Sequence, residues 1–265
     1  MFAIDAAEER FGFSAQQTGG HMARSMMLDE LRLLFDAVPP TATRKEYQRA
    51  IVDENALGKP TASSRDKSYR HLVELYGLEK STALFRALRQ LAIQDPASIP
   101  LMGMVVAFCR DAQLRHSFGL IDPMRSGEVL PRERMEQHLE TGFPGRFSAA
   151  MKKSLAQNVN TTWTYAGHLG GKSTKVRALP KPREAATTLA MLAGYLLGLR
   201  GQLLLESEFA RLVAQDPGVV TTHLAKASSR GLLRFRHAGG VTEVDFSPML
   251  TPIELSFPRH SEVSS

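Results

Sequence analysis

The sequence predicts a mainly α protein: a helical bundle with helix-turn-helix or winged-helix-like units and a C-terminal β-hairpin wing. From Met26 to about Phe118, apolar residues recur at the three- and four-residue spacing of amphipathic helices. Residues 184–246 read as helix, helix, turn, helix and two-stranded hairpin, which is the winged-helix order. The hairpin is indicated by two period-2 segments around Gly239-Gly240.

The chain divides into four predicted segments. Residues 1–25 contain glycines and no clear apolar period, so we expect a flexible N-terminal arm. Residues 26–121 form a helical domain with a helix-turn-helix-like unit. Residues 122–183 open on a turn-rich connector and form a helical middle region with a basic wing or linker. Residues 184–265 form a winged-helix-like C-terminal domain.

In the helical domain, helices over residues 44–55 and 61–76 are joined by a turn at Gly58-Lys59-Pro60. We expect Thr43 and Thr61 to cap these helices, with Glu46 completing a capping box. The inner stripe of the second helix is predicted to be Tyr69, Leu72, Val73 and Tyr76. The opposite, polar face carries Ser63, Ser64, Lys67, Arg70 and His71. This face is either a surface for a polyanion or the solvated face of an ordinary capped helix.

In the middle region, helices over residues 131–141 and 148–169 precede a basic stretch, residues 170–183, which holds five basic residues and no acid. The longer helix repeats an apolar residue every four positions, at Met151, Leu155, Val159 and Trp163. The region follows the winged-helix plan loosely. A helical hairpin followed by a basic linker is an equally good interpretation.

In the C-terminal domain, the helix before the hairpin, residues 219–229, stands in the place of a recognition helix. If Val220, Leu224 and Ala227 are buried, then Thr222, Lys226 and Ser229 point outward. Basic side chains flank this helix and its hairpin: Arg230, Arg234, Arg236 and His237. Such a unit binds DNA in many proteins, but the same fold also serves protein contacts alone.

Charge, cysteine content and the length of the apolar runs limit the possible classes of protein. The chain carries 33 Lys and Arg against 27 Asp and Glu, net +6, a moderate basic excess that favours attraction to polyanions without fixing the fold. A single cysteine, Cys109, excludes an internal disulfide and a multi-cysteine zinc site, and fits a reducing, cytoplasmic location. The apolar runs at residues 99–108 and 189–199 are shorter than the roughly 20 residues of a membrane span, so we expect no membrane partner.

Catalytic motifs are not evident. The stretch HLGGKST has Ala166 where a phosphate-binding loop needs glycine, and it follows a helix instead of a strand. No two of the histidines stand at the i, i+3 or i, i+4 spacing of a helical metal site. Cys109 lies in an apolar helix and is expected to be buried. We therefore expect no enzyme, no catalytic residue, no metal, no cofactor and no small-molecule substrate.

Four segments in order resemble the BrxA family of BREX phage-defence systems, over about residues 26–254: ENALGKPTASSRDKSYRHLVELYGL, RHSFGLID, FSAAMKKSLAQNVNTTWTYAGHL and ASSRGLLRFRHAGGVTEVDF. The family's middle motif is matched by Asn55, Lys59, Thr61, Arg65, Tyr69 and Tyr76. The resemblance implies a mostly helical protein, likened to NusB-type antiterminators, that binds DNA and works with other phage-defence proteins. The chain departs from this pattern by its N-terminal arm and its basic segment at residues 172–183.

The hypothesis that combines these observations is a non-catalytic, double-stranded-DNA-binding component of a bacterial phage-defence system, contacting mainly phosphates. The candidate DNA-binding residues are Lys59, Thr61, Ser64, Arg65, Lys67, Arg70, Lys152, Lys153, Lys172, Lys175, Arg177, Thr222, Lys226, Arg230, Arg234 and Arg236. The alternatives are a protein–protein scaffold and an RNA-binding, antiterminator-like factor. A shared face for the basic residues favours DNA binding, and a scattered arrangement favours the scaffold.

Overall fold

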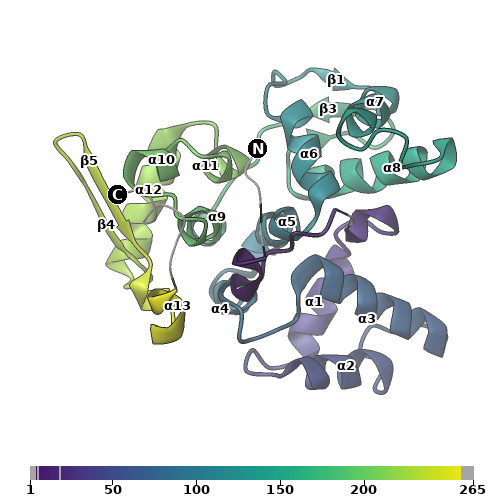
Figure 1. Cartoon of the computed structure of the whole chain (residues 1–265), viewed down its shortest axis with the longest axis horizontal. Coiled ribbons are helices and arrows are strands. Elements are labelled where there is room, and N and C mark those ends of the chain that lie inside the picture. Colours follow the sequence, from purple (N-terminus) through teal and green to yellow (C-terminus); the bar gives the residue numbers. More distant parts are fainter. Residues whose placement is uncertain (1–3, 5, 18, 258–265) are drawn as a thin grey trace.

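The structure is a computed structural model that describes residues 4, 6–17 and 19–257. It is mainly helical with two small antiparallel sheets, one of which is the hairpin β4–β5 (Figure 1). The predicted fold class is therefore confirmed.

The first helical region extends to Arg110. Its elements are η1 (Glu8–Phe11), η2 (Gly20–Met22), α1 (Leu28–Ala37), α2 (Arg44–Val52), α3 (Ala62–Tyr76), α4 (Ala83–Gln94), η3 (Pro96–Ser98) and α5 (Ile99–Arg110). The two predicted caps are present. The backbone N–H of Thr43 donates to Glu46 Oε2 at 2.6 Å, and Glu46 N donates back to the Thr43 hydroxyl at 3.4 Å. Thr61 and Ser64 form the same reciprocal box at the start of α3.

The buried stripe of α3 differs from the predicted one. Ser68, Leu72, Leu75 and Tyr76 are buried, while Tyr69 and Val73 are only partly covered. The helix is thus rotated toward Ser68 and Leu75 relative to the expected stripe, because α5 and η2 both pack against it. Ser68 is only 7% exposed although it is polar, so a stripe of apolar residues does not include it.

The predicted flexible arm is wrong for the described part of residues 1–25. Phe11 and Phe13 are buried in the main core. The His21 side chain is fully buried between α6 (Ala112–Ile121) and α8 (Ala149–Tyr165): Nδ1 lies 2.9 Å from Asp111 Oδ2 and Nε2 lies 2.7 Å from Thr162 Oγ1. These buried residues are isolated and do not recur at a regular spacing, so no sequence pattern could reveal that the segment packs against the core.

The middle region continues from α6 through β1 (Val129–Leu130), α7 (Arg132–Gly142), α8, β2 (Leu169–Gly170) and β3 (Lys175–Arg177). Its three strands form an antiparallel sheet in the order β1-β3-β2. Because α6 packs on α7 and α8, it belongs with this region. The expected boundary at residues 121 and 122 therefore falls inside a unit that runs from α6 to β3.

The C-terminal region contains α9 (Glu184–Leu196), α10 (Gly201–Leu205), α11 (Glu208–Val213), α12 (Pro217–Ser229), β4 (Arg234–Ala238), β5 (Val241–Asp245), η4 (Ser247–Met249) and α13 (Pro252–Ser256). The predicted hairpin is confirmed, with Arg234 opposite Asp245 and Ala238 opposite Val241. Gly239 and Gly240 both have positive φ, as a two-residue hairpin turn of this kind requires.

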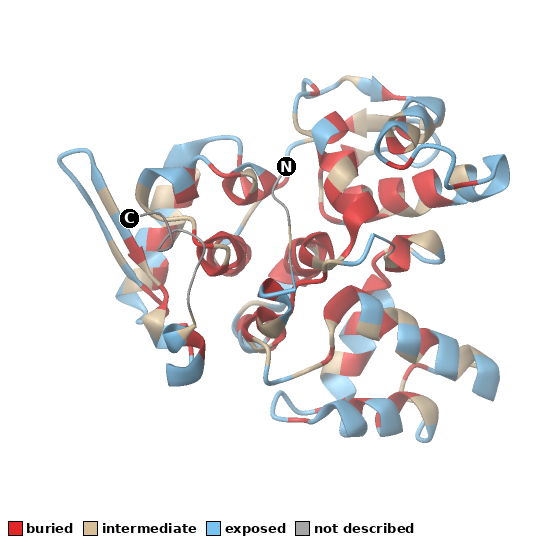
Figure 2. Ribbon diagram, viewed as in Figure 1, coloured by how far each residue is buried: buried red, intermediate tan, exposed pale blue. Residues whose placement is uncertain are grey.

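Two helices form the centre of the molecule. Residues 101–109 of α5 and 185–196 of α9 are buried throughout, and the two helices pack against each other and against α4 (Figure 2). These are the apolar runs of the sequence, and one continuous core joins all regions. Cys109 is buried as predicted. Within the described part of the chain, no helix has the length and apolarity needed to span a membrane.

Candidate nucleic-acid interface

The middle region has winged-helix topology. Helix α6, strand β1, helices α7 and α8, and strands β2 and β3 follow in that order, and the sheet order β1-β3-β2 places the last strand between the other two. Helix α8 stands third, in the position of a recognition helix. The sequence indicates this topology only loosely, because β1 has two residues, too few to show the period of a strand.

Buried side chains on the inner face of helix α8 hold it in place. Leu155, Val159 and Trp163 are buried as predicted, and the Trp163 indole N–H donates to Ser117 Oγ at 2.8 Å. Met151, the expected first member of the stripe, is 45% exposed. It lies on the first turn, beyond the cover of the neighbouring helices. The outer face of the helix presents Lys153 and other polar groups to solvent.

The second predicted lysine of this helix has a different environment. Lys152 is half-buried, and its ammonium lies 3.0 Å from Glu140 of α7. Glu140 neutralises the ammonium. The N–H that Gly145 donates to this carboxylate, followed by Lys152, lowers the pKa of Glu140. Lys152 thus holds α7 and α8 together, whereas Lys153 remains exposed.

The wing between β2 and β3 is polar and exposed at Lys172, Ser173 and Thr174. Lys175 is half-buried and donates from Nζ to the Gly171 carbonyl at 2.8 Å, which folds its side chain back over the loop. The sequence had singled out both lysines, but not Ser173 and Thr174, whose hydroxyls lie at the tip of the wing.

Arg177 does not lie on the surface. It is 2% exposed, and its guanidinium donates to the His168 carbonyl at 3.1 Å and to His168 Nδ1 at 3.2 Å. Burial lowers the pKa of Arg177. The expectation that Arg177 contacts DNA is wrong in this fold, because a strand with three residues alternates faces and places its last side chain inward.

The C-terminal region has a second winged-helix-like arrangement, made by α9, α11 and α12 followed by the hairpin. A first strand comparable to β1 is absent from the described sheet. The chain at Gly201 lies in its place beside β5: a Cβ there would be 3.1 Å from the Thr242 carbonyl oxygen. Gly201 has φ +53°, so the close approach and the backbone conformation both favour glycine.

The candidate residues of α12 and the hairpin differ in whether they already have a hydrogen-bond or ion-pair partner. Thr222 is exposed, and its hydroxyl donates to the Gly218 carbonyl at 2.8 Å. Arg230 pairs with Glu184 at 3.1 Å and Arg234 pairs with Asp245 at 3.3 Å, both while exposed. Lys226 and Arg236 are exposed and form no ion pair within the described residues. They are the most available cations of this unit.

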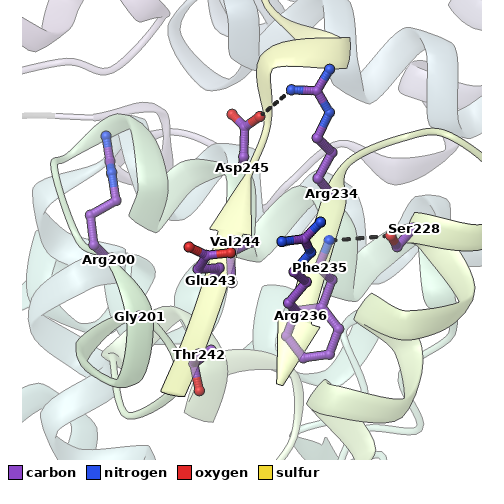
Figure 3. Close-up of a pocket in the computed structure, with 10 residues that line it drawn as sticks. All are labelled: Arg200, Gly201, Ser228, Arg234, Phe235, Arg236, Thr242, Glu243, Val244 and Asp245. Carbon is purple, nitrogen blue, oxygen red and sulfur yellow. Dashed lines mark hydrogen bonds and ion pairs between the residues drawn. The ribbon is translucent and has the colours of Figure 1, made fainter. Parts of the chain in front are cut away.

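A hollow of about 600 Å³ lies over the hairpin and is flanked by α12 and the start of α10 (Figure 3). Its charged lining is Arg200, Arg234, Arg236, Glu243 and Asp245. Arg200 donates to the Tyr195 carbonyl at 2.7 Å and stacks on the Tyr195 ring, so it supports α9. Carboxylates and guanidinium groups alternate here, so the hollow is not a cationic pocket.

The first unit uses several predicted residues for its own structure. Lys59 Nζ lies 2.8 Å from Glu30 Oε1, and its N–H donates to Asn55 Oδ1 at 2.7 Å. Thr61 and Ser64 are engaged in the capping box, and Arg65 is half-buried. Lys67 and Arg70 are exposed on α3. The ordinary capped-helix interpretation thus describes the start of α3, and only the middle of the helix presents cations.

The candidate cations do not gather on one continuous surface. The hairpin lies at one end of the longest axis of the molecule, whereas α3 and α8 lie toward the other end (Figure 1). Helices α3 and α8 both contact η2, which holds them on either side of the N-terminal segment. Together with the burial of Arg177, this arrangement does not meet the single-face criterion derived from the sequence.

No protein-family model and no curated protein matches this chain. Among the described residues, no group of His, Cys, Asp and Glu side chains is placed to hold a metal ion. Burial raises the pKa of the Cys109 thiol to about 12, which leaves it protonated and unreactive as a nucleophile.

Proposed function

We propose that this protein is a non-catalytic, double-stranded-DNA-binding protein that contacts mainly phosphates. The observation that carries the proposal is the winged-helix order of residues 112–177, with α8 in the recognition-helix position and the β2–β3 loop as its wing. In this geometry the exposed face of the third helix enters the major groove, and the wing contacts the neighbouring backbone.

The available cations suit phosphate contact better than base recognition. Lys153 on α8 and Lys172 on the wing serve the middle unit, and Lys226 and Arg236 serve the C-terminal one. Lysine and arginine at such positions neutralise phosphates and release counterions, which gives weak sequence selectivity and strong salt dependence. Lys67 and Arg70 of α3 are a third contact set.

The resemblance of four segments to the BrxA family supports a place in a bacterial BREX-type phage-defence system, with other defence proteins as partners. In that setting a DNA-binding subunit without catalytic groups would deliver or hold a complex on the duplex.

A second candidate function is a protein–protein scaffold, and the separation of the basic groups at the two ends of the molecule favours it (Figure 1). A scaffold has no need for cations on a common surface. Comparing the affinities for duplex DNA and for RNA distinguishes the RNA-binding alternative from DNA binding.

The test is a fluorescence-anisotropy titration of the full chain with a labelled random-sequence duplex of about 20 base pairs, and with RNA of the same length, from about 50 to 200 mM salt. We expect duplex binding that weakens steeply with salt. Absence of binding at the lowest salt would exclude DNA binding and leave the scaffold. Tighter binding of the RNA would favour the antiterminator-like function.

A further inference from the structure

An apolar groove of about 410 Å³ lies where the regions meet, away from the candidate DNA contacts on α8, α12 and the hairpin. Its lining comes from η3 and the start of α5, from the end of α8, and from Ala186 of α9. The extended segment 178–183 borders it. Two large apolar side chains on its rim, Tyr165 and Leu179, are each 44% exposed.

The bordering segment has the backbone of an unpaired strand. Pro180 and Pro182 fix their own φ angles and hold Leu179 and Lys181 in extended conformations. Pro180 is buried, whereas Leu179 and Lys181 on either side of it are exposed. Gly167 lies against this segment, where a Cβ would meet the Pro180 Cα at an ordinary contact distance of 3.5 Å, so its φ of +83° is what favours glycine there.

The backbone groups of this segment are available to a ligand. Within the described residues, the N–H and C=O groups of Leu179 and Lys181 make no hydrogen bond. Prolines deny one edge of an extended segment its donors, so the groups of Leu179 and Lys181 lie on the other edge. An extended peptide satisfies such an edge by strand addition, while adjacent pockets receive its side chains.

Charge indicates which peptide the groove fits. Among the described residues that line it, Lys181 and Arg183 are the charged ones. Arg183 is engaged, with Nε 2.7 Å and 2.9 Å from the two carboxylate oxygens of Asp95. Lys181 is exposed and forms no ion pair within the described residues. An acidic residue next to an apolar one would therefore be favoured, and a basic residue would be repelled.

We propose that this groove docks a short extended segment of a partner protein, with an apolar side chain seated between Tyr165 and Leu179 and an acidic neighbour facing Lys181. The inference does not depend on DNA binding. It identifies where a partner would attach at the C-terminal end of α8, whereas the candidate DNA contacts Lys153 and Lys172 do not line the groove.

The test is a selection of displayed random peptides of about eight residues on the immobilised full-length protein. The most enriched peptide is then synthesised and titrated by anisotropy. We expect enriched peptides with an aliphatic or aromatic residue flanked by Asp or Glu. Leu179→Ser should weaken binding of the synthetic peptide at least tenfold, and selection on Lys181→Glu should shift the flanking residues from acidic to basic.

The matched control is Leu203→Ser, which removes a leucine that is 69% exposed on α10, outside the groove. It should bind the peptide like the unsubstituted protein, and thermal melting establishes that all variants are folded. The proposal is overturned if no sequence is enriched, if Leu179→Ser binds normally, or if Lys181→Glu retains acidic peptides. It is also overturned if the two groove substitutions weaken duplex binding and leave peptide binding unchanged.

Discussion

Arg177 Nη1 donates a hydrogen bond to Nδ1 of His168 at 3.2 Å, with both side chains fully buried. Because Nδ1 accepts this bond, the neutral imidazole carries its proton on Nε2, which donates to the Leu212 carbonyl at 2.9 Å. The pair thus links the wing strands of the middle unit to α11 of the C-terminal unit. A residue expected to contact DNA instead joins the two winged-helix-like units.

The burial of His168 in this link predicts that the stability of the protein falls at acidic pH. Burial, followed by the neighbouring Arg177 cation, lowers the pKa of His168 from 6.5 to about 3. The folded state therefore favours neutral His168, so its stabilisation is complete above about pH 6.5 and is lost as the pH falls toward about 3. We expect this group alone to reduce the free energy of unfolding by about 1 kcal/mol at pH 5.5. Urea unfolding at pH 7.5, 5.5 and 4.5 measures it.

His138 and His223 have pKa values lowered in the same direction by burial, so the control must isolate His168. His168→Asn keeps an amide that can hydrogen-bond there, and its stability should fall less with acid than that of the unsubstituted protein. The NMR signals of the His168 ring, followed as a function of pH, should show a neutral imidazole at pH 5.5. A charged ring at that pH would contradict the assignment.

A second prediction concerns the contact of the N-terminal segment with α6. Asp111 Oδ2 accepts from both the backbone N–H and Nδ1 of His21, and its Oδ1 caps α6. A Cβ at Gly19 would lie 2.1 Å from Asp111 Oδ2, although the backbone there is extended and open to any residue. We expect Gly19→Ala to lower the free energy of unfolding by about 2 kcal/mol or more.

Gly170→Ala is the matched substitution, because the nearest atom to a Cβ there is the Val176 carbonyl oxygen at 4.0 Å. Chemical denaturation of both variants compares them directly. Equal stability of the two would mean that the His21–Asp111 contact does not hold the segment in solution.

The fold class, the caps and the hairpin could be predicted because each depends on local chemistry. Thr43 and Thr61 have donors three residues ahead, and Gly239-Gly240 supplies the positive φ angles of the turn. The packing of the N-terminal segment could not be predicted. It depends on His21 meeting Asp111, 90 positions away in the chain, and no local period carries that information.

The candidate site was predicted less well than the fold, because formal charge says nothing about partners. Lys59 and Lys152 both look like available cations in the sequence, yet each is paired with a glutamate from another segment of the chain. Lys153 and Lys226 have the same side chain and are exposed. Only the position of the acid in space separates these two kinds of lysine.

This distinction gives a third prediction. Lys59→Gln removes a half-buried pair with Glu30 and should reduce stability by about 1 kcal/mol. Because the lysine is already paired, duplex affinity and its salt dependence should change little. Anisotropy and urea unfolding of the same variant measure both. A large loss of affinity without a loss of stability would show instead that Lys59 contacts DNA.

The fourth prediction compares the exposed cations of the three units. Three double variants are made: Lys67→Gln with Arg70→Gln, Lys153→Gln with Lys172→Gln, and Lys226→Gln with Arg236→Gln. If both residues of a pair contact phosphates, the slope of log affinity against log salt should become less steep by about 1.8, and binding at low salt should weaken. We expect the full effect for the Lys153 and Lys172 pair, since α8 and its wing have the complete winged-helix geometry.

Comparing the salt slopes of the double variants on duplexes of different length then tests how the protein would lie on DNA. Because the hairpin and α8 lie toward opposite ends of the molecule, one duplex must run along its length to reach both (Figure 1). In that case, shortening the duplex to about 10 base pairs should remove the effect of one pair and keep the other. Arg32→Gln is the control, since Arg32 is exposed on α1 outside all three sets and should leave the slope unchanged. If all four variants retained the original slope, these exposed cations would not be phosphate contacts.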